Sequence, residues 1–178
     1  MAEPSGGKLN ISKKTRFLAQ NALLAALALA LSALELLIPP LPMLPPGAKL
    51  GLSNIVTMYA AGASGLVPAL CIALLKGIFS GVTRGVTALL MSLFGGIFST
   101  LVMWLLLRTK SRPFGFIGLG VAGALSHNFA QLMVAMALTT PAIVYYIPWL
   151  ILFGIASGIV TGMVLRTVMP LLDKLNLE

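Results

Sequence analysis

The chain has 178 residues, of which 58% are apolar and only 9% are charged, and its mean hydropathy is +1.02. A water-soluble domain could not bury so much apolar surface, so the composition indicates an integral membrane protein. The formal net charge of +8 does not predict a nucleic-acid partner, because the sequence has no basic helical face with interleaved aromatics in a soluble domain. We expect an all-α protein, a compact bundle of about six transmembrane helices in the lipid bilayer.

The N-terminal part predicts a leader and a first helix. Residues 1–16 are basic and lack an apolar run, which favours a cytoplasmic leader over a cleavable signal peptide. Residues 17–38 are long and apolar enough to span a membrane, and Pro39 and Pro40 end the helix. Three small residues follow one stripe of this helix at four-residue spacing: Ala22, Ala26 and Ala30. The stripe suits either docking of a partner helix or packing within the bundle.

A proline-rich connection, residues 39–49, separates the first helix from the second. It holds five of the eleven prolines, so it should be stiff and extended. Such an apolar loop could cover a cavity as a lid, or it could be an ordered connection at the lipid interface. The next apolar stretch is too long for one span and has turn residues near its middle, which predicts helices at residues 50–64 and 66–82.

Three further apolar runs predict helices at residues 85–107, 114–138 and 143–168, followed by a cytoplasmic tail at 169–178. With six spans and a cytoplasmic N-terminus, nine of the twelve Lys and Arg residues fall on the cytoplasmic side. We therefore expect both termini in the cytoplasm and the membrane to be the plasma membrane. Lys49, Lys76 and Arg84 then fall toward the outer half.

Polar side chains within the predicted spans or at their ends are candidates for a binding site, because charge in or near hydrocarbon is costly. They are Glu35, Lys76, Arg84, His127, Asn128 and Gln131. For Lys76 and Arg84 the alternative is that they reach the outer headgroups, and Glu35 could simply neutralise Lys49 or Lys76. His127 and Asn128 could instead form an interhelical hydrogen bond that only holds the bundle together. As a set, these side chains would suit a ligand with a negative or strongly polar end.

Chemical catalysis is not expected. The sequence lacks a phosphate-binding Gly-rich loop, a Cys or His cluster for a metal, and a Ser, His and acid combination. Asp173 is the sole aspartate, whereas a prenyl diphosphate synthase would need Asp-rich magnesium sites. We therefore predict no enzyme activity, no cofactor and no metal. Cys71, alone in an apolar helix, is expected to be a small buried residue.

Three motifs in order carry a family resemblance: Glu35-Leu-Leu-Ile-Pro-Pro, Pro46-Gly-Ala-Lys-Leu-Gly-Leu-Ser-Asn54 and Ser126-His-Asn-Phe-Ala-Gln131. From about Arg16 to Arg166 the chain resembles heptaprenyl diphosphate synthase component I, also called the Gx transporter family. That family is similar to the S-components of energy-coupling-factor (ECF) vitamin transporters. These six-helix proteins bind substrate and work with a transmembrane T-component and two cytoplasmic ATPases. The resemblance implies that the ligand-facing positions are Lys49, Asn54, His127, Asn128 and Gln131. It also implies that the small-residue face of the first helix docks the T-component.

Three functions stay open. The first is capture of a small vitamin-like, quinone- or isoprenoid-precursor, or flavin-related molecule for uptake. The second is an accessory role in flavin- or quinone-linked electron transfer, because relatives lie beside genes for such systems. The third is a subunit of a prenyl diphosphate synthase. We favour uptake, with substrate entering from the outer side under the proline-rich loop.

Overall fold

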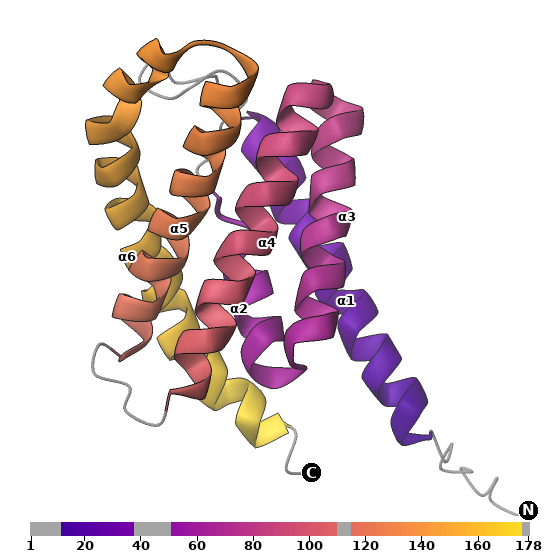
Figure 1. Ribbon diagram of the computed structural model, residues 1–178. Helices are drawn as coiled ribbons and strands as arrows, with labels where there is room; N and C mark the ends of the chain where they lie inside the picture. The colour runs from indigo at the N-terminus through magenta and orange to yellow at the C-terminus, as the bar shows by residue number, and fades with distance from the viewer. Residues whose placement is uncertain (1–11, 38–50, 110–114, 176–178) are drawn as a thin grey trace, which may run out of the picture.

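Six α-helices and two short 3-10 helices make up the computed structural model, which describes residues 12–37, 51–109 and 115–175 (Figure 1). The first half comprises α1 (Lys13–Leu34), η1 (Glu35–Leu37), α2 (Asn54–Ala63) and α3 (Leu66–Arg84). The second half comprises α4 (Val86–Arg108), α5 (Gly115–Leu138), η2 (Pro141–Tyr146) and α6 (Ile147–Leu175). The described residues contain no strand, so the expected all-helical fold is confirmed for them.

Among the described residues, five helical segments are long and apolar enough to cross a membrane: Lys13–Leu37, Leu66–Arg84, Val86–Arg108, Gly115–Leu138 and Ala142–Thr167. The helix expected at residues 50–64 is too short to cross a membrane. In the structure it is α2, which has 10 residues and is about 15 Å long. The first and last helices extend beyond their predicted bounds. The first begins at Lys13, within the predicted leader, and the last runs on to Leu175, within the predicted tail. The proline-rich connection at residues 39–49, with Lys49, lies outside the described residues.

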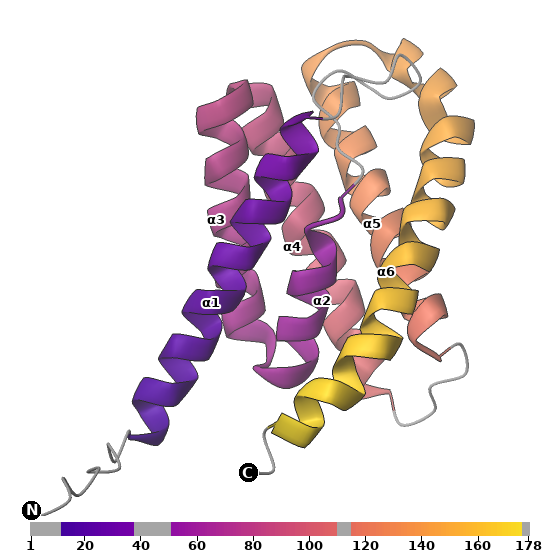
Figure 2. The same ribbon diagram turned by 180° about the vertical axis from the view of Figure 1, so that it is seen from behind.

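The short α2 lies inside the bundle and contacts all five other α-helices. In both views it occupies the half of the bundle in which the first and last helices have their free ends (Figures 1 and 2). Its N-terminal residue, Asn54, is therefore placed at an intermediate depth among the longer helices. This interruption of a helix inside the bundle positions the polar residues described below.

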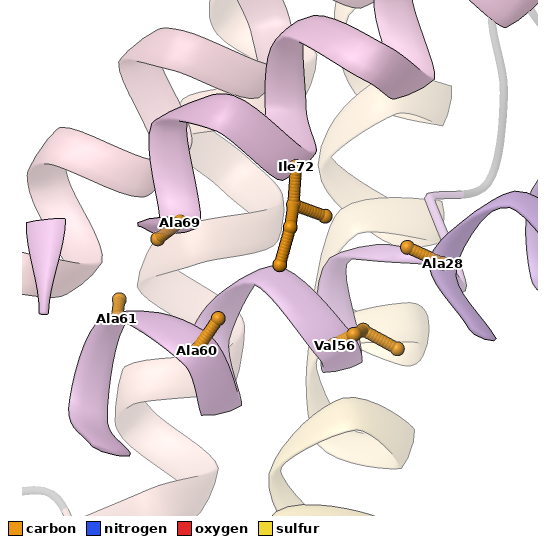
Figure 3. Packing of buried hydrophobic residues seen from close by; sticks show 6 residues of the cluster. All are labelled: Ala28, Val56, Ala60, Ala61, Ala69 and Ile72. Atoms are coloured by element: carbon orange, nitrogen blue, oxygen red, sulfur yellow. The ribbon is translucent and has the colours of Figure 1, made fainter. Parts of the chain in front are cut away.

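Small side chains allow α1, α2 and α3 to pack closely. One buried cluster consists of Ala28, Val56, Ala60, Ala61, Ala69 and Ile72 (Figure 3). Ile72 on α3 points toward α2, and four of the six residues are alanines. Two further clusters join α4 and α5 to the rest, one with α2 and α6 around Met58 and Met103, the other with η2 and α6 around Met91. Against expectation, Cys71 on α3 is exposed, because it lies outside these contacts.

Tight turns and backbone contacts complete the bundle. The link between α3 and α4 is the single residue Gly85, whose φ of 88° is readily adopted only by glycine. Helices α5 and α6 touch through backbone at their glycines, since a Cβ added to Gly158 would lie 2.5 Å from Cα of Val121. The structure therefore has an apolar, tightly packed frame, against which the buried polar side chains stand out.

Candidate functional site

The site begins where the chain turns into α2. Gly51 has a φ of 79°, in the left-handed region, and its carbonyl accepts a hydrogen bond from the Asn54 N–H at 2.9 Å. This turn starts the helix inside the bundle and buries the Asn54 side chain, which is 5% exposed. A residue with a Cβ at position 51 would also collide with Asn54 Nδ2, at 2.8 Å. Glycine is therefore required both by the turn and by the close approach of Asn54.

Lys76 on α3 is buried next to this helix start. Its Nζ donates a hydrogen bond of 2.8 Å to Oδ1 of Asn54, and the side chain is only 4% exposed. The alternative that Lys76 reaches out to headgroups is thus wrong, because the ammonium lies within the bundle. A buried cation is costly unless it is well solvated by polar partners, and Asn54 supplies one of them.

His127 and Gln131 bring α5 to the same region. The Gln131 amide nitrogen lies 3.0 Å from Nε2 of His127, one turn away on the same helix, and both side chains are buried. The Cε1–Nδ1 edge of the imidazole lies against α4, where a Cβ added to Gly95 would be 2.9 Å from Cε1. A Cβ added to Gly51 would lie 3.8 Å from Cδ2 of His127. We call Asn54, Lys76, His127 and Gln131 the central cluster, because Gly51 links its two halves.

Asn128 faces elsewhere. Its Nδ2 donates a hydrogen bond of 2.8 Å to the carbonyl of Leu150, and a Cβ at Gly154 would lie 2.9 Å from the same nitrogen. Both contacts are with α6, so the structure favours the interhelical interpretation for this residue. The predicted patch at positions 126–131 therefore divides, since His127 and Gln131 join the central cluster while Asn128 ties α5 to α6.

A second polar group lies at the end of α3 away from α2. Glu35 is 8% exposed, and its Oε1 accepts a hydrogen bond from the Leu52 N–H. The Glu35 carboxylate also acts electrostatically on the Arg84 guanidinium, which is half-buried. Two serines with fully buried side chains, Ser32 on α1 and Ser80 on α3, belong to the same end of these helices. We call these four residues the Glu35–Arg84 cluster.

Sequence reasoning placed Glu35, Lys76 and Arg84 among the candidates but did not include Ser32, Ser80, Gly51 or Gly95. For Ser80 a signal existed, because Lys76, Ser80 and Arg84 recur every four residues and therefore share one face of α3. Lys76 donates to Asn54, and Glu35 interacts electrostatically with Arg84. The neutralisation of Glu35 by Lys49 or Lys76 stays a prediction, and Lys49 lies outside the described residues.

The three alanines of the first helix lie on its outward face. Ala22, Ala26 and Ala30 are all exposed, whereas Ala28 and Ser32 are buried on the opposite side. Packing of the stripe within the chain's own bundle is therefore wrong for this structure. The stripe remains open to a partner or to lipid.

These arrangements offer charge and hydrogen bonds for recognition of a polar group. Lys76 and Arg84 supply cationic donors, and Gln131 Oε1 and Glu35 Oε2 are buried acceptors with no hydrogen-bond partner among the described residues. In that part of the chain, no three His, Cys, Asp or Glu side chains are grouped as a metal site would need.

The model of one protein family, described as heptaprenyl diphosphate synthase component I, matches residues 24–168. Searches among curated proteins and among solved structures found no significant match. The matched range contains both polar clusters and runs from α1 into α6. Because it covers far more than half of the sequence, this chain belongs to the heptaprenyl diphosphate synthase component I family.

Proposed function

We propose that this chain is a multi-pass plasma-membrane protein that binds a small molecule inside its helical bundle, as the substrate-binding subunit of an ECF-type uptake transporter. The substrate would be vitamin-like, a quinone or isoprenoid precursor, or flavin-related. In this role the chain itself is not an enzyme and needs no cofactor or metal. A T-component and two ATPases would supply the energy.

Membrane insertion is supported by the outside of the bundle. Large apolar side chains are exposed on all five long helices, among them Leu23 at 72%, Val82 at 83%, Leu105 at 63%, Phe129 at 54% and Leu152 at 57%. A water-soluble monomer rarely exposes contiguous apolar surface on this scale, whereas lipid solvates it without penalty.

The orientation is supported by the basic residues. Lys13, Lys14 and Arg16 start α1, Arg108 ends α4, and Arg166 lies in the last third of α6. The start of α1, the end of α4 and the last third of α6 all lie toward the end of the bundle at which the first and last helices have their free ends (Figure 1). Basic residues near the ends of spans favour the cytoplasmic side. In our proposal that end is cytoplasmic, and Arg84 with Glu35 lies at the outer end.

The observation that carries the binding role is the buried Lys76–Asn54 pair at the start of the short helix α2. An ionisable group at this depth costs several kcal/mol unless it has a function or a polar environment, so intramembrane charges mark binding sites more often than structural ones. Helices that begin or break inside the bundle are a recurrent way to build a substrate site in membrane transporters. Here α2 begins inside the bundle near the buried Lys76, His127 and Gln131.

A partner is supported by the exposed alanine stripe on α1 and by the family description, whose word "component" implies a system of several subunits. Small residues on an exposed helical face let a second helix approach closely. In our proposal this face contacts the T-component.

The test is gentle purification of the chain from its native membrane, followed by mass spectrometry of the copurifying proteins and of any retained small molecule. We expect a T-component and two ATPases, together with one retained compound. Recovery of redox proteins instead would favour an accessory role in electron transfer. Recovery of a soluble prenyl synthase would favour the role that the family description names.

A further inference from the structure

Several buried polar atoms at the end of α3 have no hydrogen-bond partner among the described residues. They are Nε and Nη2 of Arg84, Oγ of Ser80, Oγ of Ser32 and Oε2 of Glu35. Ser32 and Ser80 have no exposed surface, so bulk water does not satisfy them. Buried polar groups in folded proteins are nearly always hydrogen-bonded, so a group of exceptions in one region points to a missing partner.

These atoms belong to one place in the fold. Ser80 and Arg84 are one turn apart on α3, and Ser32 and Glu35 lie one turn apart on the buried side of α1 and η1. Helices α1 and α3 are in contact, and Glu35 is the group that acts electrostatically on Arg84. Donors from one helix and acceptors from the other thus lie at the same end of the bundle.

The two Arg84 atoms are informative because of guanidinium geometry. The Nε–H and one N–H of Nη2 point in the same direction along one edge, at the spacing of two oxygens of a carboxylate or phosphate. Both donors of this edge lack a partner in the described part of the chain, although a carboxylate is near enough to interact. Glu35 does not occupy the edge, since its Oε1 is held by the Leu52 N–H and its Oε2 is unbonded.

We propose that this edge of Arg84 binds an oxyanion of the transported molecule, a carboxylate or a phosphate, in a bidentate manner. The Ser80 hydroxyl donates a third hydrogen bond to the same oxyanion. Oε2 of Glu35 accepts a hydrogen bond from a hydroxyl or N–H group elsewhere on that molecule. This inference rests on the proposed binding role and adds the chemical class of the ligand.

Charge supports the same assignment. The Arg84 guanidinium is half-buried, and an oxyanion on the edge whose two donors lack a partner among the described residues would compensate its charge directly. Uncompensated charge is costly in such a setting. Glu35 would at the same time limit binding of molecules that carry more negative charge or that lack a hydrogen-bond donor.

The experiment uses the full chain in detergent and two matched pairs of probes: geranyl diphosphate with geraniol, and 4-hydroxybenzoate with 4-hydroxybenzamide. Affinity is measured by isothermal titration calorimetry. We expect at least one oxyanion to bind more tightly than its neutral counterpart, and the pair that shows the difference tells phosphate from carboxylate. Arg84→Gln should weaken binding of that oxyanion roughly 10- to 150-fold, the loss of a charge-assisted hydrogen bond. Arg84→Lys keeps the charge but not the paired donors, so its affinity for the oxyanion should lie between those of the wild type and Arg84→Gln.

Glu35→Gln should change the affinity for geranyl diphosphate in the opposite direction to Arg84→Gln. A substitution that merely disturbs the fold would lower it instead. Glu35→Gln removes a negative charge beside the oxyanion, so affinity for geranyl diphosphate, which offers no hydroxyl or amide donor, should rise. Ser80→Ala should weaken oxyanion binding. The matched controls are Thr83→Ala, an exposed hydroxyl on the same helix, and Arg166→Gln, an exposed arginine at the other end of the bundle. Neither should change affinity.

The proposal is wrong if neither oxyanion binds the wild type more tightly than its neutral counterpart, which would mean that ordered water fills these positions. It is also wrong if Arg84→Gln keeps the preference, or if Arg84→Gln and Glu35→Gln both lower the affinity for geranyl diphosphate. Recovery of the T-component and ATPases with the wild type is scored separately. A failed oxyanion preference in a chain that still recovers these partners overturns the ligand class but leaves the transport role intact.

Discussion

Neighbouring residues on a helix can have unrelated roles, and His127 and Asn128 show this. Successive side chains on an α-helix are rotated by about 100°, so the two point to different neighbours. His127 packs against α4 and lies beside Gly51, whereas Asn128 bonds to the carbonyl of Leu150 on α6. Sequence proximity alone grouped them as one polar patch.

The first prediction separates these two residues. His127→Ala should weaken binding of the retained molecule by about 1 to 3 kcal/mol, or roughly 5- to 150-fold, because a group on that molecule loses its partner. Asn128→Ala should mainly lower the melting temperature, since it removes an α5–α6 hydrogen bond that lies away from the central cluster. Binding and thermal unfolding of both variants are the measurements. Normal binding with a lowered melting temperature in His127→Ala would make that residue structural.

A second prediction concerns the glycine beside the histidine. A Cβ at position 95 would lie 2.9 Å from Cε1 and 3.0 Å from Nδ1 of His127, so Gly95→Ala should displace the ring and reduce binding about as much as His127→Ala. The adjacent Gly96→Ala is the control, because its Cβ would meet Ala73 Cβ at an ordinary 3.4 Å. Equal affinities of the two variants would show that the ring position does not matter for binding.

The sequence identifies most polar members of the site but not their pairing. Lys76, His127, Gln131 and Glu35 stand out because each is polar within an apolar run. Their partners are distant in sequence, since Asn54 and Lys76 are 22 positions apart and Glu35 and Leu52 are 17 apart. Serines such as Ser80 are common in membrane helices, so only their burial without a partner distinguishes them.

At the scale of helices, α2 accounts for the largest difference between expectation and structure. The turn at positions 64–65 is visible in the sequence and separates two helices as predicted. The late start of α2 at Asn54 is not visible, because residues 50–53 are as compatible with a helix as with a turn. The turn follows from the left-handed φ of Gly51, which brings the Asn54 side chain to Lys76.

A third prediction belongs to α1, whose exposed alanine stripe we assign to the T-component. Ala26→Trp should reduce recovery of the T-component, because a large side chain at the centre of the outward face prevents close approach of another helix. The isolated protein should stay folded and bind its small molecule normally, since Ala26 is exposed.

Leu27→Trp is the matched control, because it replaces an exposed side chain on the same helix that is already large, 48% exposed. The measurement is the ratio of T-component to this chain after affinity purification. Unchanged recovery with Ala26→Trp would remove the docking role and leave the stripe as lipid-facing surface.

At the scale of the whole molecule, hydropathy predicts the helical class and most spans, because a run of about 20 apolar residues is the length that a helix needs to cross the hydrocarbon core. It does not predict which spans meet. Helix α3, for example, packs on α1, α2 and α4, and these contacts depend on small residues such as Ala69 and Gly96 whose burial only the structure reveals. Hydropathy also cannot decide which end of the bundle faces the cytoplasm, and for that the basic residues are needed.

The last prediction tests this orientation. Cys71 is the single cysteine of the sequence and is exposed on α3, so Cys71→Ser provides a background without a native thiol. In the Cys71→Ser variant, a cysteine is introduced by Ser5→Cys or Ser111→Cys, next to the basic ends of α1 and α4. Each should react with a membrane-impermeant maleimide only after the cells are opened. A cysteine at Thr87, exposed at the start of α4 beside Arg84, should react in intact cells. The reverse pattern would place Arg84 and Glu35 in the cytoplasm and would exclude capture of an extracellular molecule at that end, because the proposed oxyanion site would then open toward the ATPases.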